Sequence, residues 1–147
     1  MKLTSKLSLF SFTATILACG GGGGSVANPY TGNYSGAVDY FSTTNTGSTP
    51  SNSGAGTGSI LADGTLRMES SIPSITMAPD VVDATVDALG TLTSARLTFV
   101  NGSGGTVTLN GTGSVTVAGS QTRIETRFPQ VGSPTIARRY IFLVNKI

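Results

Sequence analysis

The sequence predicts an all-β domain: an antiparallel up-and-down meander of eight or nine strands that closes into a small barrel. Residues 29–147 are rich in Thr, Val, Ser and Gly, poor in helix-favouring residues, and interrupted by turn pairs about every ten residues. Strands with one apolar face close most economically into a barrel, because closure removes exposed edges. The expected strands are 34–41, 57–62, 65–70, a short piece near 74–77, 82–88, 91–100, 106–118, 121–128 and 137–145.

The first hairpin is expected at Asp63-Gly64, a strong two-residue turn signal. Successive side chains of a strand alternate between its faces, so a two-residue turn here would set Leu61 opposite Leu66. The preceding Ser/Thr/Asn/Gly stretch, Thr43–Ala55, is expected to be a long mobile loop at one rim of the barrel.

The second hairpin is centred on Leu89-Gly90. On its outer face, Asp83 would lie opposite Arg96, and such a cross-strand pair of opposite charges contributes about 0.2 to 1 kcal/mol. On its inner face, the expected pairs are Val86 with Thr93, Ala84 with Ala95 and Val82 with Leu97.

A helix over residues 79–89 is the alternative for the first half of this hairpin. Pro79 suits a first helical position, Asp80 and Asp83 would lie in the first turn, and Gly90 could cap the end. We expect the strand, and the alternative stays open at this stage.

The third hairpin is expected at Gly119-Ser120, a turn with glycine at its first central position. It sets Val117 opposite Thr122, Val115 opposite Ile124 and Phe128 opposite Gly111, with Arg123, Glu125 and Arg127 on the other face. The competing turn at Asn110-Gly111 would place Val107 opposite Ser114 and Leu109 opposite Thr112. We therefore expect one long strand, Thr106–Ala118, bent at Gly111 and Gly113.

A five-residue loop, Asn101–Gly105, should join Phe99 and Val107 on matching faces. The last strand is apolar on both faces from Tyr140 to Val144, as expected of a strand that closes the barrel against the first one. The inward-facing residues are predicted to be Tyr34, Val38, Tyr40, Leu61, Leu66, Met68, Val82, Val86, Leu97, Phe99, Val107, Leu109, Val115, Val117, Ile124 and Phe128.

Two short motifs carry a resemblance to a known group of proteins. Gly32-Asn33-Tyr34-Ser35-Gly36, followed by turn-centred strands such as Ala62-Asp63-Gly64-Thr65-Leu66, is similar to the small lipocalin-like barrel domains of bacterial surface lipoproteins. The resemblance rests mostly on turn chemistry. It implies an architecture and no catalytic residue.

The N-terminus has the pattern of an export signal. Lys2 and Lys6 form a positive region, Leu7–Leu17 is an apolar run too short to span a bilayer, and Ile16-Leu17-Ala18-Cys19 is a small-residue exit. This resembles a bacterial lipoprotein signal with its lipobox. The resemblance implies a signal peptide at residues 1–18 and lipidation of Cys19 by a diacylglyceryl group, often with a third acyl chain such as palmitate.

Alternatively, an ordinary secretory signal is cut nearby, and Cys19, the sole cysteine, stays a free thiol. In either case, residues 19–28 would be a flexible Gly-rich tether, and residues 29–147 the barrel domain. The residue after Cys19 is Gly20 rather than Asp, which resembles the outer-membrane sorting pattern of Gram-negative lipoproteins.

The charge of the mature chain argues against two classes of partner. The full sequence has 9 Lys and Arg against 7 Asp and Glu, and two of the lysines precede Cys19, which leaves seven against seven. A neutral domain has no electrostatic footprint for nucleic acid and no polybasic patch for anionic lipid. We therefore expect neither as a partner.

Enzymatic chemistry is not expected, because the chain has no histidine and one cysteine. These numbers exclude a Ser-His-Asp triad, a Cys-His pair and a thiolate or imidazole metal site. No cofactor is expected. The oxygen donors Asp80, Asp83 and Asp87 could bind calcium, but solvated roles on a strand or helix cap are expected instead.

The other polar candidates are too scattered for a catalytic pair. They comprise four carboxylates, Asp39, Asp63, Glu69 and Glu125, for glycoside hydrolysis. Arg138-Arg139 is expected to be a polar start to the closing strand. Tyr30, Tyr34 and Tyr40 would either line a ligand mouth or belong to the core and rim.

Two classes of function remain. The favoured class is a non-enzymatic, membrane-anchored envelope lipoprotein that binds a protein partner or helps to maintain the outer membrane. The alternative class is a carrier of a small apolar ligand inside the barrel.

Overall fold

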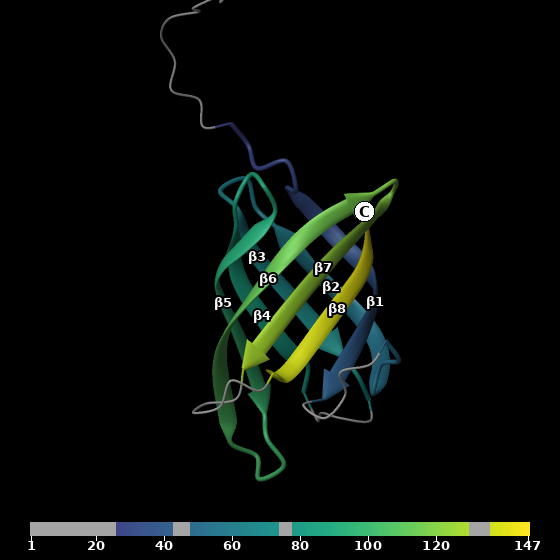
Figure 1. Ribbon diagram of the computed structural model, residues 1–147, viewed down its shortest axis with the longest axis vertical. Coiled ribbons are helices and arrows are strands. Elements are labelled where there is room, and N and C mark those ends of the chain that lie inside the picture. The colour runs from purple at the N-terminus through teal and green to yellow at the C-terminus, as the bar shows by residue number, and fades with distance from the viewer. Residues whose placement is uncertain (1–25, 43–47, 74–77, 130–135) are drawn as a thin grey trace, which may run out of the picture.

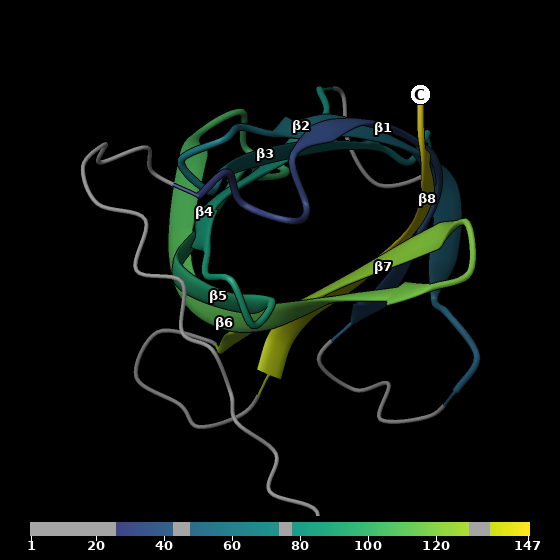
Figure 2. The ribbon, with the colours of Figure 1, turned by 90° about the horizontal axis from the view of Figure 1, so that it is seen from above.

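The protein is a closed antiparallel β-barrel of eight strands, seen from the side in Figure 1 and from above in Figure 2. The computed structural model describes residues 26–42, 48–73, 78–129 and 136–147. The strands are β1 (Gly32–Ser42), β2 (Asn52–Ile60), β3 (Thr65–Ser71), β4 (Asp80–Val86), β5 (Thr91–Val100), β6 (Thr106–Ala118), β7 (Gln121–Pro129) and β8 (Ile136–Lys146).

Each strand pairs with the next one along the chain, and β8 pairs with β1 to close the barrel. The predicted all-β meander and its closure by the last strand are therefore confirmed. The upper end of the barrel, at the top of Figure 1, is the end at which β1, β3, β5 and β7 begin and β2, β4, β6 and β8 end. None of the described residues forms a helix long and apolar enough to cross a membrane.

The core fills the inside of the barrel, because alternate residues of every strand point inward. All eight strands contribute to one cluster of buried apolar side chains. Fourteen of the sixteen residues predicted to face inward belong to this cluster or pack against it: Tyr34, Val38, Tyr40, Leu66, Met68, Val82, Val86, Leu97, Phe99, Val107, Leu109, Val115, Ile124 and Phe128.

The predicted position of Leu61 is wrong. The turn between β2 and β3 has three residues, since the Leu61 amide bonds to the Thr65 carbonyl and Gly64 has a φ of +87°. An odd loop length changes the pairing by one residue, so Ile60 lies opposite Leu66. Leu61 is consequently 53% exposed, and Ile60 takes its place in the core.

Residues 80–86 form strand β4, so the alternative helix over 79–89 is wrong. The turn after β4 again has three residues, with Gly90 at a φ of +84°, so Val86 lies opposite Leu92 instead of Thr93. A β-bulge then restores the predicted register, and Asp83 lies opposite Arg96 and Val82 opposite Leu97.

The bulge lies in β5 at Ser94, where φ is +53°. Two residues of β5, Ser94 and Ala95, stand opposite the single residue Ala84, which replaces the simple Ala84–Ala95 pair that was expected. The register between β5 and β6 shifts at the same place, beside Gly111 and Gly113. The irregularity therefore lies at the two glycines where a bend was predicted.

The loop Asn101–Gly105 and the long strand β6 are confirmed, with Phe99 opposite Val107. The turn at Gly119-Ser120 is confirmed as well, with Val115 opposite Ile124. Val117, however, is 57% exposed. Strand β5 begins at Thr91, opposite Ser114, so the residues of β6 after Ser114 pair with β7 alone.

The expected long loop Thr43–Ala55 is shorter than predicted. Asn52–Ala55 belong to β2 and pair with residues 37–40 of β1. Small residues such as Gly54 and Gly56 suit this strand, because a side chain on Gly54 would collide with the backbone of Ser71 and one on Gly56 with the Phe142 ring. Residues 43–47, and the short strand expected near 74–77, lie outside the described residues.

Candidate functional site

The N-terminal segment covers the upper end of the barrel. In Figure 2, the chain that precedes β1 curls over the opening. Asn28 fixes this segment, since its amide bonds to the Ala62 carbonyl (3.0 Å) and its side chain donates to the Val86 carbonyl (2.7 Å). Tyr34 donates from inside the barrel to the Tyr30 carbonyl, and Tyr30 packs against the core.

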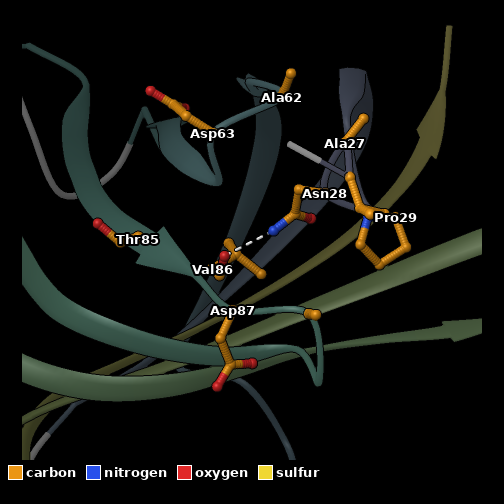
Figure 3. A pocket seen from close by; sticks show the side chains of 10 residues that line it. Ala27, Asn28, Pro29, Ala62, Asp63, Thr85, Val86 and Asp87 are labelled. Carbon is orange, nitrogen blue, oxygen red and sulfur yellow. Dashed lines mark hydrogen bonds between the residues drawn. The ribbon is translucent and has the colours of Figure 1, made fainter. Parts of the chain in front are cut away.

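Beside this segment lies an open groove of about 610 Å³ (Figure 3). It is formed by residues 26–29 and the β2–β3 and β4–β5 turns. The two carboxylates of the groove accept hydrogen bonds from backbone amides of their own turns. Asp63 accepts from the Thr65 amide (2.8 Å), and Asp87 accepts from the amides of Leu89 and Thr91.

These backbone hydrogen bonds stabilise the charged carboxylates. The Thr65 amide lowers the pKa of Asp63, and the Thr91 amide lowers the pKa of Asp87. Both groups are fully exposed. Their chemistry is that of turn formation.

The lower interior holds a polar bridge that crosses the barrel. Asp80 at the start of β4 and Arg138 at the start of β8 lie on opposite walls, and their side chains meet at 3.2 Å between Nη1 and Oδ2. Tyr140 donates its hydroxyl to the same carboxylate oxygen. The Arg138 guanidinium also lies 3.7 Å from the centre of the Phe99 ring, a cation–π contact to a third strand.

Two buried hydroxyl residues extend this bridge into a polar band. Ser70 pairs with Asp80 across β3 and β4, and Thr126 pairs with Tyr140 across β7 and β8. Burial raises the pKa of Asp80, although the Tyr140 hydroxyl and Arg138 act in the opposite direction. The Asp80 carboxyl therefore binds its proton more tightly in the folded protein than in the unfolded chain. As a result, the contribution of Asp80 to stability falls as the pH rises above the ordinary pKa of an aspartate.

The expected solvated role of Asp80 is corrected by this bridge, because Asp80 is 2% exposed. Arg138, expected as a polar start to the closing strand, lies near the start of β8, but its side chain reaches Asp80 inside the barrel. A signal was present in the sequence, because Asp80 shares the inward parity of Val82 and Val86. Arg138 likewise shares the parity of Tyr140 and Phe142. Arg139, unlike Arg138, is on the outer face of β8, where its guanidinium lies over the Phe41 ring.

The three aspartates considered for calcium do not converge. Asp80 is inside the barrel, Asp83 is outside and paired with Arg67 (3.2 Å), and Asp87 is in a turn. Within residues 26–42, 48–73, 78–129 and 136–147, no group of three or more His, Cys, Asp or Glu side chains could hold a metal ion.

The remaining carboxylates lie apart on the outer surface. Asp39 accepts from the Ser53 hydroxyl, and Glu69 pairs with Arg67. Glu125 lies between Arg123 (2.8 Å) and Arg127 (2.7 Å), on the outer face predicted for these three residues. Burial raises the pKa of Glu125, but the hydrogen bonds from the two arginines outweigh it and lower the pKa overall.

The tyrosines belong to the core and the rim. Tyr34 and Tyr40 are buried, and Tyr30 is at the upper opening. Burial raises the pKa of Tyr34, which faces Thr122. Cys19 and the rest of the lipobox lie outside the described residues.

Comparison with known proteins yields no relative: no family model matches the chain, and neither a curated protein nor a solved structure is significantly similar to it.

Proposed function

We propose that this protein is a non-enzymatic lipoprotein of the bacterial cell envelope, anchored through acyl chains on Cys19. It acts as an interaction or structural module of the outer membrane. The observation that carries the proposal is the occupied barrel. Its core cluster joins all eight strands, the Asp80–Arg138 bridge crosses the lower interior, and Tyr30 covers the upper end. Such a barrel works through its outer surface.

The distribution of side chains supports attachment by an anchor over insertion of the barrel into a bilayer. Barrels that span membranes place apolar side chains outward and polar ones inward. Here the inward positions are mostly apolar, whereas charged pairs such as Arg67 with Asp83 and Arg123 with Glu125 lie on the outside. A lipid on Cys19 would hold such a polar-coated barrel at the membrane surface, since each buried methylene contributes about 0.8 kcal/mol.

The alternative function, a carrier of a small apolar ligand, requires free space inside the barrel. Large rings occupy the region around Tyr140, whose centroid lies 5.3 Å from that of Tyr40 and 6.4 Å from that of Phe128. The nearby polar band is also a poor environment for an apolar ligand. These contacts favour the interaction module.

Replacing Cys19 with serine tests the anchor. We expect Cys19→Ser to abolish acylation and membrane retention, because serine has no thiol to carry the diacylglyceryl group. The measurement is metabolic labelling with a fatty-acid analogue, followed by membrane fractionation. A matched variant, Ser25→Ala, changes the same segment without touching the thiol and should be labelled like the wild type. Label on the Cys19→Ser protein would refute the proposal.

Native mass spectrometry of the protein purified from its own membrane tests the carrier alternative. We expect the mass of the acylated chain alone, because side chains already occupy the interior. The Phe128→Ala variant is a useful control, since an engineered apolar cavity can bind a small apolar probe such as benzene. A stoichiometric apolar molecule released from the wild type would instead establish the carrier.

A further inference from the structure

The exposed large apolar side chains of the described residues all lie at the upper end. Val26 is 95% exposed and precedes β1, Leu61 is in the β2–β3 turn, and Leu89, 88% exposed, is in the β4–β5 turn. Val117 is at the end of β6, just before the β6–β7 hairpin loop, and Ile147 follows β8. An up-and-down topology brings these five positions to one end although they are far apart in the sequence (Figure 1).

Single exposed apolar residues are ordinary on a protein surface, but five of them on the turns and chain ends at one end of the barrel are informative. The walls of the barrel carry Arg, Glu, Asp, Thr and Ser at their exposed positions, for example on β3 and β7. The five apolar residues therefore form a ring around one end of the barrel, which we name the apolar rim: Val26, Leu61, Leu89, Val117 and Ile147.

We propose that the apolar rim is a membrane-docking face, which enters the headgroup region of the bilayer that holds the lipid on Cys19. This inference rests on the proposed function. The described chain enters the barrel at the same end, where Asn28 is bonded to the β2–β3 turn and to the end of β4. Anchor and apolar rim therefore belong to the same end of the molecule.

The length of the tether supports this orientation. Val26 is seven residues after Cys19, and seven fully extended residues span at most about 25 Å. Strand β6 has 13 residues, so at about 3.3 Å per residue and a tilt of 35–45° the barrel wall is roughly 30–35 Å tall. The tether is too short to run the height of the barrel, so the lower end cannot turn towards the membrane.

The charges at the upper end indicate which kind of lipid contact to expect. Asp63, Asp87 and Lys146 lie among the apolar residues, and the two carboxylates are bound by amides of their own turns. Two negative charges beside one positive charge offer no attraction to anionic lipid. The contact is apolar and shallow, and it should occur on zwitterionic phosphatidylcholine and change little with salt.

The sequence has no tryptophan, so the tryptophan fluorescence of each variant comes from the one introduced residue. The variants are Leu89→Trp in the apolar rim and Ser103→Trp in the exposed β5–β6 loop at the lower end. Each acylated full-length mature protein is placed on phosphatidylcholine vesicles with brominated acyl chains. We expect the emission of Leu89→Trp to shift to the blue and be quenched, and that of Ser103→Trp to stay unshifted and unquenched.

Leu61→Trp serves as a second reporter in the apolar rim, in case one turn does not tolerate the ring. Vesicle-bound protein without quenching at either rim position would overturn the docking face while leaving the anchor intact. A blue shift of the rim tryptophan without quenching would indicate a protein contact instead of a lipid contact. Equal quenching at Ser103→Trp would indicate that the barrel has no fixed orientation on the vesicle. Either result would overturn the docking face. Loss of the protein from the vesicles would contradict the proposed lipid anchor itself.

Discussion

Replacing Phe128 with alanine is expected to lower the free energy of unfolding by about 3 to 5 kcal/mol. The ring is fully buried, contacts Tyr140 edge-on, and lies against Gly111 of the neighbouring strand, where a side chain would collide with it. Its removal therefore leaves a cavity that the rigid barrel cannot close. Against a total stability of about 5 to 15 kcal/mol, the loss should be evident in a urea denaturation curve.

The matched control is Arg127→Ala, at the adjacent position on the outer face of the same strand. Its side chain is about half exposed and pairs with Glu125, so the expected change is no more than about 0.5 kcal/mol. Similar small losses for the two variants would mean that Phe128 does not contribute a buried ring to the core.

The second large effect is expected for Asp80→Ala, which should cost about 3 kcal/mol of stability. The substitution leaves the Arg138 guanidinium and the Tyr140 hydroxyl inside the barrel without their shared acceptor. A buried charge that loses its partner is costly, because the free energy of its desolvation is no longer offset. Thermal and urea denaturation would both measure the difference.

Asp83→Ala is the control, because Asp83 is on the same strand and pairs with Arg67 at the same distance of 3.2 Å, but on the outer surface. The expected change is within about 1 kcal/mol, as for exposed ion pairs in general. The double variant Asp80→Leu with Arg138→Met should be more stable than Asp80→Ala, since apolar residues of similar size replace a buried ion pair well. Equal losses for Asp80→Ala and Asp83→Ala would contradict a buried bridge.

The fold could be predicted from the sequence because a strand has a period of two. Parity together with the length of each turn placed Val115 opposite Ile124 and Phe99 opposite Val107, and parity identified most of the core. The apolar character of residues 140–144 indicated the closing strand, which packs against β1 as expected. The strand pairs also needed the correct turn length, which was assigned correctly at Gly119-Ser120 and at the loop Asn101–Gly105.

Turn length was the source of the errors. An Asp-Gly or Leu-Gly pair suits a two-residue turn, but the same glycine also suits the last position of a three-residue turn, where φ is positive. Gly64 and Gly90 take the second arrangement, with φ of +87° and +84°. One extra residue moved Leu61 out of the core, whereas the bulge at Ser94 cancelled the shift in the next hairpin.

The polar bridge was missed for a different physical reason. Charged residues are rarely fully buried, so Asp80 was assigned a solvated role and Arg138 a polar start to the closing strand, despite their inward parity. Their pairing joins residues 58 positions apart on strands that are not neighbours in the barrel. Alternation says which face a side chain occupies, but it does not say which side chain of the opposite wall it meets.

The closure of the barrel by β8 has a consequence for how the chain folds. Tyr40 pairs with Tyr140, about one hundred residues later, whereas the tight hairpins, such as those of Ile60 with Leu66 and Ala118 with Gln121, join residues only a few positions apart. Closing a loop of about 100 residues costs roughly 2.7 kcal/mol more chain entropy than closing one of about five. The hairpins can therefore form early, but the ring cannot close until β8 is present, and contacts of such high contact order form slowly. If the chain is exported as proposed, the barrel cannot close before its last strand has left the translocation channel. The chain therefore stays able to pass through the channel until then.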